Sequence, residues 1–232
     1  MQNDHIKSAE EIALMRRAAA ITDDVYEYIL GIVSEGVTET ALADAIYRKT
    51  VELGASGVSF DTIVAFGESG AEPHHVPTDK RLQEGMFVTI DMGAVVEGLC
   101  SDFTRTFAFG DIDEEQRRVY DTVYEAQKLA LSAVADGTAC RAAAAAARDH
   151  IARCGYGGFY IHGTGHGVGT EIHEPPTLNA KSGETLAAGQ VVTVEPGIYL
   201  PRRMGVRIED MVLVGEGRPF SRHTTELITL RQ

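Results

Sequence analysis

Basic residues are scarce in this chain. Among 232 residues, lysine and arginine total 21 against 34 aspartates and glutamates, which gives a formal net charge of -13. Nucleic acids and anionic membrane surfaces are bound largely through clustered basic side chains. The charge balance therefore argues against both classes of partner, and it leaves the identity of a small substrate open.

Long apolar runs and cysteines are also few. Residues 1–17 contain no apolar core of the kind found in signal peptides, and no later run approaches the length of a membrane span. We therefore expect a soluble, cytoplasmic protein. The three cysteines, Cys100, Cys140 and Cys154, lack CxxC spacing. This argues against a disulfide framework or a zinc knuckle and favours reduced thiols in the core.

The apolar content of 44% is sufficient for a sizeable core. Capping-box spacing at Ser8 and Glu11, and again at Asp113 and Gln116, marks two helix starts. Apolar periodicity predicts helices over residues 8–30, 39–53, 113–135 and around 142–147. Apolar and β-branched runs predict strands over residues 58–65, 190–199, 205–214 and 223–230, with two or three more in 81–109. No linker-like composition divides the chain, so we expect one domain spanning residues 1–232.

Two acids lie at the ends of strand-like segments in the stretch 85–109. The run Met86 to Ile90 ends in Asp91, and Asp102 follows in a second β-branched and aromatic segment. A carboxylate beside a hydrophobic core requires a hydrogen-bonding partner or a metal ion. This stretch is therefore the first candidate for a functional site.

The same design occurs twice in the chain. Residues 82–93 and 186–197 share five identical positions, and each segment has an acid two residues before its last glycine, Asp91 in one and Glu195 in the other. A second acid follows each, at Asp102 and at Glu209. A chance match of a short strand pattern is the alternative, but the matching acids favour two related α/β halves with a site between them.

Each copy is preceded by a loop that carries histidines. The first, residues 67–79, contains the adjacent pair His74 and His75, an arrangement that is most often exposed and without function. The second, residues 159–176, is rich in glycine and contains His162, His166 and His173. No lysine follows these glycines as in a phosphate loop, and no helix start follows as in a dinucleotide site. We expect the glycines to allow close backbone approach around the histidines.

One constellation of five residues suits metal chemistry: Asp91, Asp102, His166, Glu195 and Glu209. Taken singly, each acid reads as an ordinary strand-end carboxylate. Together, four carboxylates would repel one another and have raised pKa values unless two divalent cations neutralised them. Oxygen-rich ligation with one imidazole favours Mn²⁺, with Co²⁺, Fe²⁺ or Zn²⁺ as alternatives. Two ions about 3.5–4 Å apart can hold a bridging hydroxide and polarise a carbonyl group.

At these residues the chain resembles the pita-bread (M24-type) metallopeptidases, which include methionine aminopeptidases, aminopeptidase P and prolidases. The resemblance covers nearly the whole chain and is strongest in PHHVPTDK, TIDMG, SDFTRTF, HGTGHGVGTEIHEPP, VTVEPGIY and GVRIEDMVLV. It implies an α+β pita-bread fold, with two pseudo-symmetric α/β halves around a dinuclear metal site. Position by position, it places Asp91, Asp102, His166, Glu195 and Glu209 as metal ligands, with Asp102 and Glu209 bridging the two ions.

The resemblance also implies roles around the metals. His74 and His173 are expected to contact the substrate and assist proton movement, and His162 to position the substrate. Arg207 is expected either to contact the substrate or to pair with one of the acids. Glu195 is expected to carry the proton of the attacking water to the leaving nitrogen, so that the catalytic residues are His74, His173 and Glu195.

Two motifs favour the proline-specific branch of the family. SDFTRTF around Asp102 is similar to prolidase and aminopeptidase P, whereas methionine aminopeptidases usually have a GDTS-like sequence, and GVRIED places Arg207 where that branch has an arginine. The implied activity is hydrolysis of Xaa-Pro bonds, in dipeptides or at the N-terminus of longer peptides, by a metal-bridging hydroxide. The expected partners are short peptides with proline at the second position.

The chain departs from that branch in two places. Prolidases and aminopeptidases P commonly carry an N-terminal creatinase-like domain, which is absent here, so the chain is either a fragment or a naturally short member. This leaves open whether the protein forms a homodimer and whether its substrate is a dipeptide or a longer peptide. His75, where many relatives have glycine, would narrow the mouth of the site. The alternatives are a methionine aminopeptidase and, from another class, a non-catalytic pita-bread module that binds a peptide or protein; a creatinase-like amidinohydrolase ranks lower.

Overall fold

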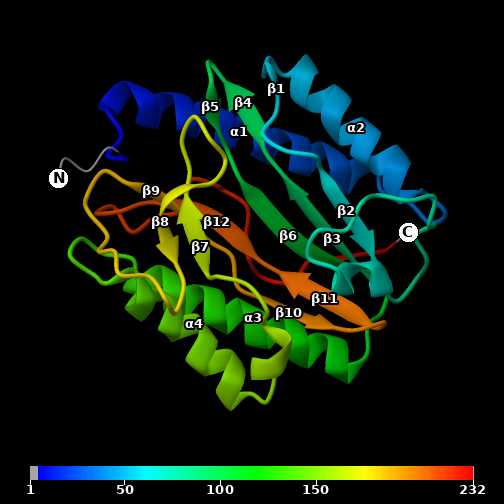
Figure 1. Ribbon diagram of the computed structural model, residues 1–232. Helices are drawn as coiled ribbons and strands as arrows, with labels where there is room; N and C mark the ends of the chain where they lie inside the picture. Colours follow the sequence, from blue (N-terminus) through cyan, green and yellow to red (C-terminus); the bar gives the residue numbers. More distant parts are fainter. Residues whose placement is uncertain (1–4, 232) are drawn as a thin grey trace.

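The computed structural model describes residues 5–231 and has two pairs of helices around a central sheet. Helices α1 (Ala9–Ile32) and α2 (Glu39–Glu52) cover one end of the sheet, and α3 (Glu114–Ala133) and α4 (Cys140–Arg153) cover the other (Figure 1). Each helix pair has its own hydrophobic core against the strands. Within residues 5–231, no helix combines the length and apolar composition needed to cross a bilayer.

The main sheet has eight strands. In spatial order, seven of them are β2 (Ile63–Phe66), β3 (Met86–Met92), β6 (Phe103–Phe109), β12 (Glu209–Leu213), β9 (Val191–Val194), β7 (Gly165–Gly167) and β8 (Glu174–Leu178). The eighth strand, β13 (Thr229–Leu230), pairs with β6 in parallel, whereas the other pairs are antiparallel.

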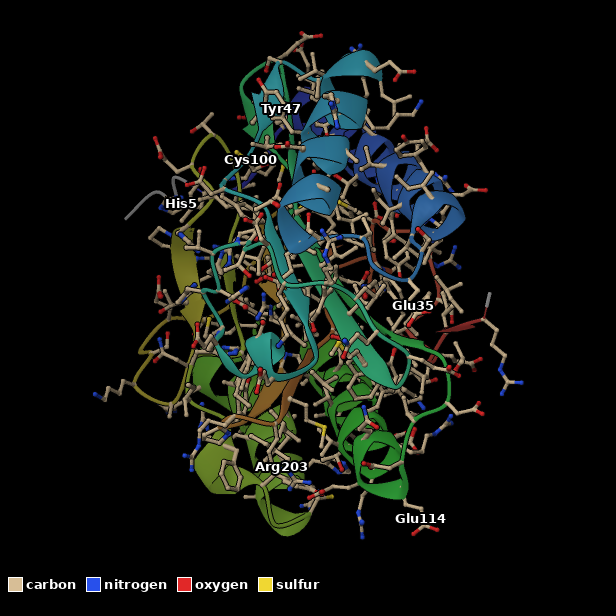
Figure 2. The ribbon with its side chains drawn as sticks, turned by 90° about the vertical axis from the view of Figure 1, so that its right-hand side faces the viewer. His5, Glu35, Tyr47, Cys100, Glu114 and Arg203 are labelled. Atoms are coloured by element: carbon tan, nitrogen blue, oxygen red, sulfur yellow. The ribbon has the colours of Figure 1, made fainter. Side chains whose placement is uncertain are left out.

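Smaller elements surround this sheet. One three-stranded sheet contains β1 (Gly57–Val58), β4 (Ala94–Val96) and β5 (Leu99–Cys100), and one hairpin contains β10 (Gly197–Leu200) and β11 (Met204–Arg207). Two 3₁₀ turns lie at Gly67–Ala71 and Gly157–Phe159. The turn between β10 and β11 is tied to α3 by an ion pair between Arg203 and Glu115, at the end of the molecule where Glu114 also lies (Figure 2).

The two halves of the sheet meet where β6 pairs with β12. Thr104 of β6 is the register partner both of Asp91 on β3 and of Glu209 on β12, so these three residues lie in a row across three neighbouring strands. The strand pair β3–β6 corresponds to β9–β12 in the repeated sequence pattern. Each pair contributes to the core of one helix pair, and the halves also share packing: Phe87 of β3 joins the core of α3 and α4, and Met211 of β12 packs against α1. The duplication therefore appears as two similar halves joined at this seam.

The predicted helices agree with the structure, and both capping boxes are formed. Three predicted strands were wrong in extent. The region 58–65 contains two strands separated by residues 59–62, 190–199 is interrupted at Glu195-Pro196, and 205–214 is interrupted at Ile208. Proline lacks the N–H group that a ladder requires, which accounts for the second interruption.

Three further predictions need correction. Only Thr229–Leu230 of the predicted closing strand 223–230 pairs as a strand. The region 81–109 contains four strands, where two or three were expected. Cys100 and Cys140 are buried free thiols as predicted, but Cys154 is exposed, because it caps the end of α4 on the surface.

Candidate metal centre

A single cavity of about 680 Å³ brings together the residues that the sequence singled out. Its wall includes residues from both halves of the sheet and from both histidine loops. The predicted site residues that line it are His74, Asp91, Asp102, His162, His166, His173, Glu195, Arg207 and Glu209.

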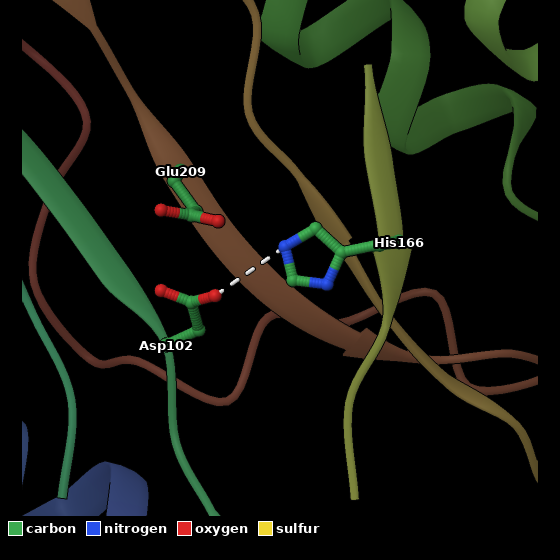
Figure 3. A group of neighbouring side chains, drawn as sticks. All are labelled: Asp102, His166 and Glu209. Atoms are coloured by element: carbon green, nitrogen blue, oxygen red, sulfur yellow. Dashed lines mark ion pairs between the residues drawn. The ribbon is translucent and has the colours of Figure 1, made fainter. Parts of the chain in front are cut away.

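Three of these side chains converge most closely. Ligand atoms of Asp102, His166 and Glu209 all lie within 4.8 Å of one another (Figure 3). Asp102 directly precedes β6, Glu209 opens β12 and His166 lies on β7, so the pairing of the strands determines their approach. Nε2 of His166 is 3.5 Å from Oδ2 of Asp102. This is a compact group of two carboxylates and one imidazole.

Glu195 extends the group on the side of the second half. Its Oε1 is also 3.5 Å from Nε2 of His166, and it directly follows β9. The Nδ1–H of His166 donates to the carbonyl oxygen of Gly167 at 3.0 Å. Because that bond places the proton on Nδ1, the lone pair of Nε2 is directed at the carboxylates. Such an outer hydrogen bond is what orients a metal-ligating histidine.

Asp91 is held differently from the other acids. Its Oδ2 accepts a hydrogen bond from Nη2 of Arg207 at 2.5 Å. Its Oδ1 is buried and has no hydrogen-bond partner among the residues that the structure describes. A buried carboxylate oxygen without a donor is costly, and a cation coordinated by that oxygen would remove the cost.

The acids of the centre strongly affect one another's protonation. Burial and then the neighbouring carboxylates raise the pKa of Asp102 and of Glu209 well above their ordinary values. Burial raises the pKa of Glu195 to about 8, and it lowers the pKa of His166 to about 4. The low pKa of His166 keeps its imidazole neutral and able to ligate, whereas the acids need positive charge to ionise together.

The donor set therefore fits divalent cations. Four carboxylates and one imidazole form an oxygen-rich donor set of the kind that binds divalent cations. The unpartnered Oδ1 of Asp91 and the correctly oriented Nε2 of His166 point to the same conclusion. Asp102, His166 and Glu209 form a group that fits one cation, and Asp91 and Glu195 line the same cavity.

Beside the acids lies a hydrogen-bonded chain that the sequence did not reveal in full. Tyr199 accepts a hydrogen bond from Nη1 of Arg207 at 2.9 Å, and its own hydroxyl donates to Nε2 of His162 at 2.7 Å. The Nδ1–H of His162 donates to the carbonyl oxygen of Gly163 at 2.6 Å, which fixes this tautomer. Arg207 thus pairs with an acid, one of its two expected roles. Tyr199 was missed because it lies in an apolar strand, where a tyrosine carries no distinguishing signal.

Two further polar residues, Thr104 and Arg105 of β6, form hydrogen bonds that fix the position of Glu209. Thr104 donates to Oε2 of Glu209 at 2.6 Å and accepts from Nε of Arg207 at 3.2 Å. Arg105, buried in the seam, donates to the backbone carbonyls of Thr104 and Glu209 and to the carboxylate of Asp210. These contacts lock β6 against β12 where Asp102 and Glu209 approach each other.

The histidine loops lie at the cavity wall. The ring of His173 is 4.4 Å from that of His166, centroid to centroid, and His74 is exposed to the cavity. His75 also lines the cavity, but its Nε2 is directed away, toward Glu39. The glycine prediction is confirmed at Gly165, where a Cβ would collide with the carbonyl oxygen of Thr193.

Comparison with known proteins identifies the family. The family model described as metallopeptidase family M24 matches residues 13–216. The chain belongs to this family. An uncharacterized peptidase of Bacillus subtilis (strain 168), YqhT, is 43% identical over 227 residues, which are 97% of this chain and 64% of that protein. The predicted resemblance is thereby confirmed.

Solved structures of M24 proteins show the same architecture. An Xaa-Pro dipeptidase from Bacillus anthracis matches with a TM-score of 0.95 and 41% identity, over 97% of this chain and 64% of that one. A prolidase from Pyrococcus furiosus matches with a TM-score of 0.93 and 40% identity, over 95% and 66% respectively. The chain therefore has the pita-bread fold. It spans less than two thirds of the length of each of these relatives.

Proposed function

We propose that this chain hydrolyses Xaa-Pro bonds, in dipeptides or at the N-terminus of longer peptides, as a dinuclear metallopeptidase. The observation that carries the proposal is the meeting of five candidate ligands with His74, His162, His173 and Arg207 in one cavity of about 680 Å³. The similarity to proteins named Xaa-Pro dipeptidase and prolidase supports the same substrate class.

In the proposed centre, Asp91, Asp102, His166, Glu195 and Glu209 would hold two divalent ions, with Mn²⁺ favoured. The chemistry that such ions supply when bound is polarisation of the scissile carbonyl and a lowered pKa for a water molecule. The single imidazole, with its neutral Nε2, completes a ligand set that is otherwise anionic.

The protein's own side chains then bind the substrate and transfer protons. Glu195, which lies 3.5 Å from Nε2 of His166, takes the proton from the attacking water and passes it to the proline nitrogen as the C–N bond breaks. His74 and His173 contact the substrate and assist proton movement, and one of them donates to the oxygen that gains charge when water adds to the carbonyl. His162, fixed by Tyr199, positions the peptide, and Arg207 maintains the orientation of Asp91.

The decisive experiment is product analysis by mass spectrometry with Mn²⁺-loaded protein and a mixture of Ala-Pro, Ala-Pro-Ala and Met-Ala-Ser. Cleavage of Ala-Pro alone identifies a prolidase, and cleavage of Ala-Pro-Ala identifies an aminopeptidase P. Release of methionine alone would replace the proposal with a methionine aminopeptidase. No cleavage of any peptide, in protein shown by elemental analysis to carry metal, would favour a binding module. The chelated protein is the control.

A further inference from the structure

The loop between β2 and β3 holds His74 between two anchors. On one side of His74, the carbonyl oxygen of Pro73 accepts a hydrogen bond from Nη1 of Arg207 at 3.4 Å. On the other side, the ring of His75 is directed away from the cavity, and its Nε2 lies 2.8 Å from Oε2 of Glu39. The two neighbours of His74 are thus attached to different parts of the protein.

Glu39 is the first residue of α2, and it is fully buried, with 0% exposure. Besides Nε2–H of His75, its carboxylate accepts from the backbone N–H of Phe66 at 2.9 Å and from the N–H and hydroxyl of Thr78 at 3.0 and 2.7 Å. Phe66 ends β2 and Thr78 lies beyond the histidine pair. One carboxylate therefore fixes the start, the middle and the end of the segment 66–78.

The surroundings of Glu39 stabilise the negative charge of its carboxylate. Burial alone would raise the pKa of Glu39, but hydrogen bonds from His75, Thr78 and Phe66 outweigh it and hold the pKa below its ordinary value. The beginning of a helix also favours negative charge. Hydrogen bonds to an ionised acceptor are shorter and stronger than neutral ones. Loss of this carboxylate would leave several donors facing a buried site without an acceptor.

We propose that Glu39 and His75 are positioning residues for His74: the hydrogen bond from His75 to the Glu39 carboxylate fixes the loop so that the His74 imidazole faces the bound substrate. The inference rests on the proposed function, in which His74 contacts the peptide. Neither Glu39 nor His75 is itself a catalytic residue. The hydrogen bond between Glu39 and His75 lies on the side of the loop that faces away from the metal centre.

The test is a double-mutant cycle with Mn²⁺-loaded protein and the Xaa-Pro peptide that the wild type cleaves. Glu39→Gln and His75→Ala are each expected to lower kcat/KM by about tenfold. His75→Gln, which keeps an N–H group near the position of Nε2, is expected to recover most of that loss. In a His74→Ala background, assayed at higher enzyme concentration, the same substitutions are expected to change kcat/KM by less than twofold.

Glu68→Gln is the matched control, because Glu68 lies on the same loop but its side chain is 65% exposed and pairs with Lys80 rather than with His75. It should leave kcat/KM unchanged in both backgrounds. A purely structural role for Glu39 and His75 predicts instead the same loss with and without His74. That result would overturn the proposal, as would wild-type kinetics in His75→Ala.

Amide hydrogen exchange over residues 66–79 provides a readout that needs no turnover. Glu39→Gln and His75→Ala should speed exchange in this segment, and Glu68→Gln should not. If Glu39→Gln fails to fold, His75→Ala carries the same comparison. If the wild type cleaves no Xaa-Pro peptide, the proposed function fails, and exchange alone decides whether the pair holds the loop. Unchanged exchange in His75→Ala overturns the proposal whether or not the protein is a peptidase.

Discussion

Arg207 and Asp91 form an ion pair at the edge of the metal centre, with Nη2 of Arg207 donating to Oδ2 of Asp91 at 2.5 Å. The two residues are separated by 116 positions in the chain and come from different halves of the fold. The same guanidinium also contacts Tyr199 and Thr104. One side chain therefore connects an acid of the first half with polar groups of both halves.

Replacement of Arg207 should show how much this connection contributes. Arg207→Lys keeps the charge but cannot reach Asp91, Tyr199 and Thr104 at once, and we expect a 10- to 100-fold loss of kcat/KM. Arg207→Met leaves the Asp91 carboxylate buried without a counter-charge, which typically costs about 3–5 kcal/mol. We expect that loss in the unfolding free energy of the metal-free protein, measured with denaturant, and a smaller loss with Mn²⁺ bound.

Arg203→Met is the matched control for Arg207→Met. Arg203 forms an exposed ion pair with Glu115, and exposed pairs contribute at most about 1 kcal/mol. Equal stability of the two variants in the metal-free state would contradict the importance given to the buried pair.

Glu195 is expected to be indispensable for turnover. Glu195→Gln keeps an oxygen ligand but removes the group that accepts and returns a proton, and such a group contributes about 10²- to 10⁴-fold. We expect kcat to fall by at least 100-fold in protein whose metal content, measured by elemental analysis, is retained. Glu226→Gln, at an exposed position, should behave as the wild type. Near-normal turnover in metal-loaded Glu195→Gln would assign the proton transfer elsewhere.

The metal-free protein should become less stable as the pH rises from about 6.5 to 8. Burial raises the pKa of Glu195 to about 8, and the pKa values of Asp102 and Glu209 are raised as well. In this window the folded state binds protons that the unfolded state has lost, so stability present at lower pH is lost as the pH approaches 8. His162 and His166, with pKa values of about 4, remain neutral in the folded state.

Mn²⁺ should reverse that trend, because its ligands bind as carboxylates. We expect the rise in melting temperature on addition of Mn²⁺ to grow between pH 6.5 and 8. Differential scanning fluorimetry with chelator and with Mn²⁺ measures both quantities. A melting temperature of the chelated protein that increases over this range would show that the acids are not protonated in the folded state.

Lys7 should influence the loop that carries His173. Its Nζ is 2.7 Å from Oε2 of Glu174, the residue after His173, and the two side chains are only 8% and 11% exposed. Lys7→Met should leave Glu174 with the more distant His5, at 3.3 Å, and with the backbone N–H of Glu171, at 3.1 Å. We expect faster amide exchange over residues 169–174 and about tenfold lower kcat/KM, because a displaced His173 loses contact with the substrate. Lys181→Met, at an exposed position, should change neither quantity, and an equal effect in both variants would refute the role of Lys7.

The sequence was most informative where a local pattern carried the signal. Both capping boxes and the paired acids Asp91 and Glu195 could be recognised because each depends on residues close together in the chain. The pairing of Arg207 with Asp91 and of His75 with Glu39 could not be specified, since each depends on the register of distant segments. The interruption at Ile208, just before Glu209, was likewise invisible, because an apolar residue in a strand-like run gives no sign that the ladder breaks there.

The seam between β6 and β12 also has a consequence for how such a centre could arise. Asp102 comes from one half and Glu209 from the other, so a polypeptide containing only one half would need a second copy of itself to assemble the cluster. Fusion of two such halves replaces an encounter between separate molecules, which becomes rarer on dilution, with a contact inside one chain at a high effective concentration. The repeated pattern then allows the copies to diverge, with aspartate kept in one half and glutamate in the other.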